Sequence, residues 1–190
     1  MSKILYLHGF ASSADSTKAK IIKHYVKRSA NATTILIPDL DNNIKNAYHQ
    51  IEEIIKIESP SSIIGSSLGG FFGTYFSEKY DLLCVNINPA IPPIDMSEYL
   101  GENENYSTGE KFVIDQDQLD LLDTMNQKIK RLKKHKNLMT LVQSGDEVLD
   151  YKLAIQYFAG SQIEVTFGGN HSFEDFESYI IKIQKFLNLH

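Results

Sequence analysis

The stretch IIGSSLGG, residues 63–70, changes abruptly from β-branched side chains to glycine and serine. Gly65, Ser67 and Gly69 make the pattern G-x-S-x-G, which follows an apolar run typical of a strand and opens a segment typical of a helix. This is the context of a nucleophile elbow, a strained turn that lifts a serine Oγ above the sheet edge. Small residues two before and two after the serine avoid clashes there. The spacing therefore selects Ser67, and not Ser66, as a candidate nucleophile.

The same stretch has two simpler interpretations. It could be a glycine- and serine-rich turn that only joins a strand to a helix, because G-x-S-x-G often occurs by chance. It could also be a phosphate-binding loop, but the letters GSSLGG lack the Lys-Ser/Thr ending that holds phosphate and metal. The serine interpretation therefore depends on finding a base, an acid and oxyanion donors elsewhere in the chain.

Length and composition favour one globular domain over residues 1–190. The chain has 42% hydrophobic and 23% charged residues, which are ordinary values for a globular protein. The net charge of −5 argues against a general nucleic-acid binder, because affinity for phosphate needs clustered Lys and Arg. The basic run KIKRLKKHK, residues 128–136, is interpreted as the solvated face and last turn of a helix.

Cysteine usage and hydropathy indicate a reduced, cytoplasmic compartment. The single cysteine, Cys84, lies in the apolar run LLCVNI, which suggests a buried and inert thiol. The first ten residues lack a long apolar core and a cleavage site. No run of eighteen uninterrupted apolar residues occurs, so we expect neither a membrane span nor membrane association.

Strand-like and helix-like segments alternate along the chain. Short apolar runs typical of strands buried on both faces occupy residues 3–7, 34–37, 62–65, 82–87, 138–142 and 162–166. Segments with helical spacing occupy residues 16–29, 43–58, 67–80, 118–134, 151–159 and 172–188. This alternation predicts an α/β fold, with a mostly parallel sheet of about six strands flanked by helices on both faces. Residues 89–117 break the rhythm, and we expect an irregular insert or small cap there.

His171 is the candidate base. It lies in the glycine-rich loop TFGGNHSFEDFE, between the last predicted strand and the last predicted helix. Such loops gather at the carboxyl ends of parallel strands, where ligands bind. The order serine, acid, histidine is also the order found in α/β-hydrolases. A histidine that only caps the last helix is the alternative.

The acid should follow the penultimate strand, where the sequence is LMTLVQSGDEVLDY. Asp146 comes first after the Gly145 turn and is our first choice to orient the imidazole and stabilise the imidazolium. Asp150 ranks second because it is placed to cap the next helix. Glu147 ranks third because we expect it to be solvated.

Two backbone N–H groups are candidates for an oxyanion hole. One belongs to Leu68, directly after the candidate nucleophile, and the other to Phe10 in the segment YLHGF after the first strand. Gly9 would let this backbone come close to the serine. His8 is then interpreted as a structural anchor of the loop and not as a second base.

Several segments together resemble the YqiA-like esterases, a family of small bacterial α/β-hydrolases. The resemblance rests on YLHGFASSADSTKA, IIGSSLGGFFGTYFSEKY, VNINPAIPP, GENENYSTGEKF, QSGDEVLDY and GGNHSFEDFE, and it covers nearly the whole chain. It implies an α/β-hydrolase fold without the first two strands, a Ser–Asp–His triad at Ser67, Asp146 and His171, and esterase activity toward acyl esters. The segment SSADS departs from the family, in which a proline tends to follow the serine pair.

The sequence thus predicts a serine esterase that acts through an acyl-enzyme on a small acyl ester or thioester, with neither a metal nor an organic cofactor. An acyl-CoA thioesterase and a non-catalytic binding module are the alternatives. Phe10, Phe71, Ile91, Pro92 and Tyr99 are candidates for lining the acyl pocket, although core packing is the default role of each. The insert could select the substrate, and the oligomeric state stays open.

Overall fold

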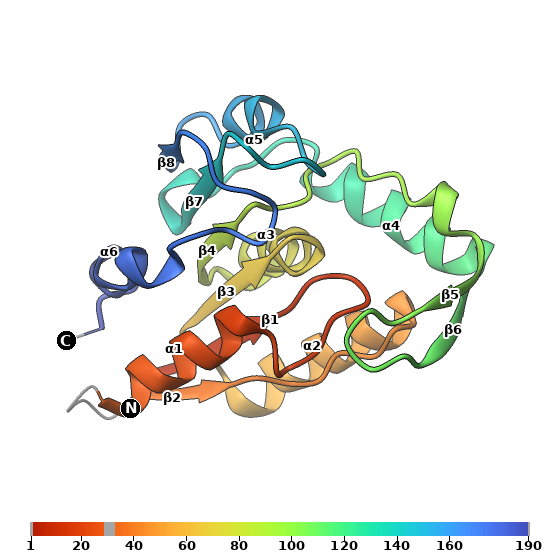
Figure 1. Cartoon of the computed structure of the whole chain (residues 1–190), viewed down its shortest axis with the longest axis horizontal. Coiled ribbons are helices and arrows are strands. Elements are labelled where there is room, and N and C mark those ends of the chain that lie inside the picture. The colour runs from red at the N-terminus through yellow and green to blue at the C-terminus, as the bar shows by residue number, and fades with distance from the viewer. Residues whose placement is uncertain (1, 29–32, 190) are drawn as a thin grey trace.

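Six parallel strands form the central sheet of the computed structural model, which describes residues 2–28 and 33–189 (Figure 1). The strands are β1 (Ser2–Leu7), β2 (Thr33–Leu36), β3 (Ser62–Ser66), β4 (Leu83–Ile87), β7 (Leu138–Gln143) and β8 (Gln162–Thr166). Their order across the sheet is β2-β1-β3-β4-β7-β8, and each neighbouring pair is parallel. The predicted sheet is confirmed. Since all strands run the same way, the loops that follow them open at one edge.

Helices cover both faces of this sheet, as the sequence predicts (Figure 1). Helices α2 (Ile44–Glu58), α3 (Leu68–Tyr80), α4 (Gln116–Ile129) and α5 (Tyr151–Tyr157) pack on one face. Helices α1 (Thr17–Arg28) and α6 (Ile180–Phe186) pack on the other. Successive residues of β1 alternate between the two cores: Leu5 and Leu7 face the first, and Ile4 and Tyr6 face the second.

Helix α3 is the most deeply buried helix that follows a strand of the sheet. All ten residues from Leu68 to Ser77 are buried. Small residues permit this depth: a Cβ added at Gly69 would lie 2.2 Å from the carbonyl oxygen of Leu7, and one at Gly65 would lie 2.2 Å from the carbonyl oxygen of Gly69. The helix start therefore packs directly on the backbones of β1 and β3.

A chain of polar side chains ties α3 to β4 inside the core. The Cys84 thiol donates to Asn86 Oδ1 at 3.2 Å, and Asn86 Nδ2 donates to Thr74 Oγ1 at 3.1 Å. Cys84 is fully buried, as its apolar run predicts, and burial raises the pKa of its thiol. The thiol therefore has a packing role and stays protonated.

Residues 89–117 contain more regular structure than their composition suggests. A 3₁₀ turn, η1 (Ser97–Tyr99), leads into an antiparallel hairpin of β5 (Gly101–Glu104) and β6 (Lys111–Ile114). Figure 1 shows this hairpin away from the main sheet, at one end of the molecule. The expectation of an irregular segment missed the hairpin because β5, with the sequence GENE, contains no strand-forming residue.

Two helices differ from their predicted bounds by more than two residues at one end. Helix α4 ends at Ile129, so most of the basic run lies beyond the helix, and the predicted end at residue 134 is wrong. The chain bends there because the N–H groups of Lys133 and Lys134 both donate to Glu78 Oε1, at 2.9 and 2.8 Å. Within residues 2–28 and 33–189, no helix has both the length and the apolar character needed to cross a bilayer.

The last helix begins later than the sequence predicts. A 3₁₀ turn, η3 (Phe176–Tyr179), precedes α6, and residues 172–175 are not helical. Phe173 and Asp175 have positive φ angles of 63° and 54°, which a right-handed helix cannot contain. The segment before α6 is therefore a tight loop, and this loop carries His171.

The glycines of α3 can be tested by substitution. Gly69→Ala should lower the free energy of unfolding by about 2 kcal/mol more than Gly73→Ala. Both changes bring the same gain in helix propensity. The new Cβ at Gly69 overlaps backbone, whereas at Gly73 it meets the Cys84 sulfur at 2.9 Å. Urea unfolding measures both values, and equal losses would contradict the proposed packing.

Candidate active site

Ser67 occupies the turn between β3 and α3 in a strained backbone conformation. Its φ and ψ angles are 55° and −121°, outside the regions that non-glycine residues favour. Hydrogen bonds hold this conformation: the Ser67 N–H donates to the carbonyl of Ile87 at 3.1 Å, and its carbonyl accepts from Gly70 at 2.9 Å and Ala90 at 3.1 Å. The turn thus has the geometry that the G-x-S-x-G spacing predicts.

The side chains of Ser67, His171 and Asp146 form one hydrogen-bonded chain. His171 Nε2 lies 3.1 Å from Ser67 Oγ. On the other side of the ring, His171 Nδ1 lies 2.8 Å from Asp146 Oδ2 and 3.0 Å from Oδ1. A carboxylate only accepts, so Nδ1 carries the proton and Nε2 is free to accept from the serine hydroxyl. The structure therefore brings together the three side chains that the sequence selects.

The other two carboxylates in the segment after β7 have different partners. Asp150 is the N-cap of α5, and its side chain accepts from the N–H of Lys152. Glu147 is exposed, and its Oε2 accepts from the backbone N–H of His171 at 3.0 Å. Neither carboxylate contacts the imidazole, which agrees with the ranking made from the sequence.

The Asp146 carboxylate is stabilised in its ionised form. Its side chain is 2% exposed, and burial alone would raise its pKa. Hydrogen bonds from His171 and from the N–H groups of Leu149 and Val148 outweigh burial and hold the pKa below its ordinary value. The carboxylate is therefore charged at neutral pH and can fix the orientation of the imidazole.

Two buried amides hold the loop that carries His171. Asn88, at the end of β4, donates from Nδ2 to the carbonyls of Asn170 at 2.9 Å and His171 at 3.2 Å. Gln143, at the end of β7, accepts through Oε1 from the N–H groups of Asn170 at 3.1 Å and Glu174 at 2.8 Å, and donates to the Glu174 carbonyl at 2.8 Å. The Asn88 side chain also joins the ends of β4 and β7, because its Oδ1 accepts from the backbone N–H of Gln143 at 2.9 Å.

The sequence analysis missed both amides. Each is 2% exposed and ends an otherwise apolar strand, in the segments VNINP and TLVQS. A polar residue at the end of a buried strand needs a partner in the adjacent loop. That pattern is the signal that could have identified them.

The loop after β1 comes close to Ser67. A Cβ added at Gly9 would lie 3.2 Å from the Ser67 Cβ and 3.7 Å from its Oγ. The next residue, Phe10, and Leu68 at the start of α3 carry the N–H groups that the sequence selects. Neither N–H donates to another group within residues 2–28 and 33–189. Both therefore remain available for an added acceptor.

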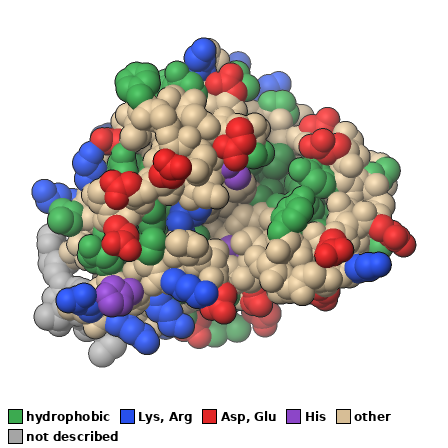
Figure 2. Space-filling view, viewed as in Figure 1, with side chains coloured by type: hydrophobic (Ala, Val, Ile, Leu, Met, Phe, Trp, Pro, Cys, Tyr) green, Lys and Arg blue, Asp and Glu red, His purple; other side chains and the backbone are tan. Residues whose placement is uncertain are grey.

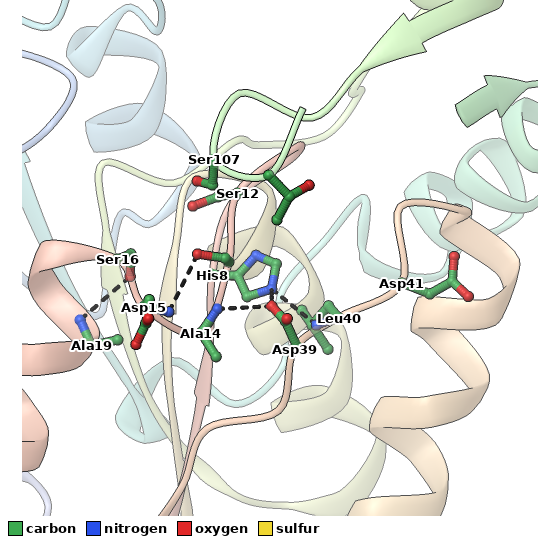
Figure 3. A network of polar contacts seen from close by, with 12 residues as sticks. His8, Ser12, Ala14, Asp15, Ser16, Ala19, Asp39, Leu40, Asp41 and Ser107 are labelled. Carbon is green, nitrogen blue, oxygen red and sulfur yellow. Dashed lines mark hydrogen bonds and ion pairs between the residues drawn. The ribbon is translucent and has the colours of Figure 1, made fainter. Parts of the chain in front are cut away.

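His8 holds this loop in place through the hydrogen bonds of its ring. Figure 3 shows the ring next to Asp39 and Leu40. Its ring is buried, and Nε2 accepts from the Leu40 N–H at 2.9 Å, so the other nitrogen, Nδ1, carries the proton and donates to the Gly9 carbonyl at 2.9 Å. Burial lowers the pKa of His8, although the Gly9 hydrogen bond and the Asp39 carboxylate oppose the shift. Asp39 also accepts from the Ala14 N–H at 2.9 Å, which fixes the following turn. His8 is thus a neutral structural residue.

An open cleft of about 490 Å³ surrounds Ser67 and His171. Figure 2 shows a hollow near the centre of one face, with histidine side chains inside it. Of the pocket residues expected from the sequence, Phe10 and Tyr99 line the cleft and pack edge-to-face at 5.0 Å between ring centroids. The remaining lining residues are Tyr6, Gly9, Ala11, Ser12, Ser16, Lys18, Ser66, Tyr106, Ser107, Val148 and Ser172.

Three expected pocket residues do not line the cleft. Phe71 is fully buried in the core beside Phe72, with ring centroids 6.2 Å apart, because the first ten residues of α3 are buried on every side. Ile91 and Pro92 are partly buried and lie outside the lining of the cleft. The expectation that these three residues form the acyl pocket is therefore wrong for this cleft.

The turn of the β5–β6 hairpin forms one wall of the cleft through Tyr106 and Ser107. Its position is fixed by Asn105, which is 3% exposed and donates to the carbonyl of Ser12 at 3.1 Å. The N–H of Tyr106 also donates to the carbonyl of Ala11 at 3.0 Å. The hairpin is therefore bonded to the same loop that carries the Phe10 N–H.

Within residues 2–28 and 33–189, no three His, Cys, Asp or Glu side chains are grouped so that they could hold a metal ion. A larger depression of about 790 Å³ lies elsewhere, along α1 and next to Glu177, and shares no lining residue with the cleft. This depression is therefore separate from the cleft that holds Ser67 and His171.

A family model described as "Uncharacterised protein family (UPF0227)" matches residues 3–188. The chain belongs to this family. The resemblance to the YqiA-like family is thereby confirmed. The matched residues include all of the site described above, from the loop after β1 to the loop of His171.

Solved structures with the same fold include several α/β-hydrolases. Est1E from Butyrivibrio proteoclasticus has 11% identity and a TM-score of 0.68, covering 99% of this chain and 87% of that one. The mouse alpha/beta hydrolase domain-containing protein 10 has 14% identity and a TM-score of 0.68, covering 98% and 89%. A monoacylglycerol lipase from Paleococcus ferrophilus has 14% identity and a TM-score of 0.69, covering 98% and 94%. The α/β-hydrolase fold is confirmed.

The role of Gln143 can be tested by hydrogen exchange. Gln143→Met should speed exchange of the amides of residues 170 and 174, because their acceptor Oε1 is lost, and should lower the free energy of unfolding by about 2 kcal/mol. The matched control is Thr140→Val on the same strand. The buried Oγ1 of Thr140 has no hydrogen-bond partner among the described residues, so this change should be neutral or stabilising. Equal exchange in both variants would contradict the role assigned to Gln143.

The lowered pKa of Asp146 predicts a pH-dependent stability. A carboxyl group with a pKa lower in the folded than in the unfolded state stabilises the fold above about pH 4, the ordinary aspartate value. This contribution is lost as the pH falls through the folded-state pKa. Asp146→Asn removes it, so the difference in unfolding free energy between wild type and variant should shrink as the pH falls below 4. Urea unfolding between pH 3 and 7 measures it, and a constant difference would refute the assignment.

Proposed function

We propose that this protein is a serine hydrolase that cleaves carboxylic esters through an acyl-enzyme. The observation that carries the proposal is the chain of hydrogen bonds from Ser67 Oγ through His171 to Asp146, at 3.1 and 2.8 Å. The fold is shared with solved structures of lipolytic enzymes, a monoacylglycerol lipase and an esterase domain, which agrees with this reaction class. A serine hydroxyl needs such a neighbouring base to become a nucleophile near neutral pH.

The geometry supplies each step of acyl transfer. Ser67 Oγ attacks the carbonyl carbon while its proton passes to His171 Nε2, and Asp146 stabilises the resulting imidazolium. The N–H groups of Phe10 and Leu68 donate to the oxyanion. His171 then gives the proton to the leaving alcohol, and the acyl group stays on Ser67. A water molecule, deprotonated by His171, attacks the acyl-enzyme and releases the acid.

The strained turn and the oxyanion donors belong to the same arrangement. Helix α3 begins directly after Ser67, so its free N-terminal N–H groups favour developing negative charge beside the nucleophile. Removing one oxyanion donor typically lowers turnover by about 10²- to 10³-fold. A thioester would react by the same steps, since the relay acts on the acyl carbon and pocket shape decides among leaving groups.

The proposed function can be tested by removing the nucleophile. Ser67→Ala should lower the turnover of 4-nitrophenyl acetate by at least about 10³-fold and abolish labelling by a fluorophosphonate probe, with little change in stability. Ser66→Ala is the matched control. Ser66 makes no hydrogen bond to the imidazole, so this variant should still be labelled at Ser67. A binding module without activity would take no label in either the wild type or Ser66→Ala. Peptide mapping of the label to any residue other than Ser67 would also reject the proposal.

A further inference from the structure

Among residues 2–28 and 33–189, Lys18 is the one lysine or arginine on the wall of the cleft. It is the second residue of α1, and it lines the cleft together with Ser67 and His171. No Asp or Glu is among the lining residues in the described part of the chain. The cleft wall therefore carries a local positive charge, although the net charge of the protein is −5. In Figure 2 basic side chains are visible inside the hollow.

The ammonium of Lys18 has unused hydrogen-bonding capacity. Its Nζ donates to the carbonyl of Ser172 at 2.8 Å, and an ammonium has three N–H donors. Within residues 2–28 and 33–189, no carboxylate lies at salt-bridge distance from it. Asp146 attracts it through space, but that carboxylate already accepts from the imidazole and two backbone N–H groups.

The surroundings of Lys18 disfavour the charged form of its ammonium group. Burial lowers its pKa to about 8, although Asp146 opposes the shift. The first turn of α1 contains no acidic residue, and a cation at a helix N-terminus opposes the helix dipole. An anion bound here would therefore gain from both the ammonium and the helix end, and would remove the unfavourable interaction between them.

Hydroxyl groups line the same cleft as Lys18. Ser12, Ser16, Ser107 and Ser172 line the same cleft, and each can donate to an oxygen acceptor. The aromatic residues Phe10 and Tyr99 lie on the cleft wall as well. A substrate with one charged and one apolar portion would match these two kinds of lining better than a purely aliphatic ester would.

We propose that Lys18 binds an anionic oxygen group of the substrate, so that the preferred substrates are esters carrying a carboxylate or a similar anion near the scissile bond. This inference rests on the proposed ester hydrolysis. The anion could belong to the acyl group or to the alcohol, and the recognition chemistry is the same in both. Lys18 is a specificity-determining residue in this proposal, and Ser67, His171 and Asp146 still carry out the reaction.

Two pairs of substrates separate the acyl side from the alcohol side. On the acyl side, 4-nitrophenyl hydrogen adipate is compared with 4-nitrophenyl hexanoate, which has the same chain length and no charge. On the alcohol side, 4-acetoxybenzoate is compared with its methyl ester. For each pair the measured quantity is the ratio of kcat/KM for the charged ester to kcat/KM for the neutral ester. A general loss of activity cancels in this ratio.

The wild type should prefer the charged ester by at least about tenfold in one of the two pairs, and Lys18→Gln should lower that ratio by at least about tenfold. A charge-assisted contact of about 1.4 kcal/mol corresponds to such a factor. Lys18→Arg keeps the charge and should retain most of the preference. The control is Lys20→Gln, which removes an exposed lysine from the same helix, outside the cleft, and should leave the ratio within threefold of wild type.

The two proposals fail in different ways. If Ser67→Ala abolishes hydrolysis of the neutral esters but Lys18→Gln leaves both ratios within threefold of wild type, the serine hydrolase stands and the role of Lys18 is overturned. The same holds if the wild type does not discriminate within either pair. If the wild type hydrolyses none of the four esters, or if Ser67→Ala remains active, the proposed function is overturned together with this inference.

Discussion

The tight crossing of the β3–α3 turn over the end of β1 is the constraint on which the site depends. With glycine at positions 65 and 69, the helix can start on top of two strand ends, with no space left for a Cβ at either position. This contact forces Ser67 into its positive-φ conformation. It also brings Gly9 so close to the serine that a Cβ added at Gly9 would lie 3.2 Å from the Ser67 Cβ. The position of the nucleophile and that of the candidate oxyanion donors are therefore set by one packing interaction.

The position of His171 depends on a different set of contacts. His171 lies on a loop with no regular structure, and such loops are usually mobile. Here, two buried amides from neighbouring strand ends make five hydrogen bonds to it, through Asn88 and Gln143. The loop is thus attached to the rigid sheet directly and does not rely on its own sequence for shape. Because the Asn88 side chain also accepts from the backbone N–H of Gln143, a change at Asn88 should affect the ends of both β4 and β7.

Local patterns predict the fold well because each strand is buried on both faces. The expected strand at 162–166 has the observed bounds. Each of the other strands differs by one residue at one end or, for β2, at both ends. Ser67 and His171 could be selected since a motif or a loop position marks each one in the sequence. Their catalytic roles stay a prediction.

The missed features all depend on tertiary contacts that leave little trace in the local sequence. The hairpin of β5 and β6 begins with a strand of polar residues and glycine, GENE, and its placement depends on Asn105 bonding to the loop after β1. The end of α4 depends on Glu78, a residue of another helix. Phe71 looked suitable for a pocket, but a helix buried along ten consecutive residues has no face left for one. Lys18 received no prediction from the sequence, since its contact with Ser172 spans 154 positions.

The charge distribution shows why a single lysine can matter in an acidic protein. Exposed charges act over about 8 Å at physiological ionic strength, so the carboxylates on the outer surface are largely screened from the interior of the cleft. Lys18 is partly buried beside Ser67 and His171, where screening is weaker and an ion pair with a substrate is correspondingly stronger. Selectivity that arises from Lys18 should therefore depend less on salt concentration than selectivity that arises from surface charge. The overall charge of −5 therefore does not exclude anionic substrates. An ester bound in the cleft would contact the ammonium, the hydroxyl groups and the imidazole of the cleft wall.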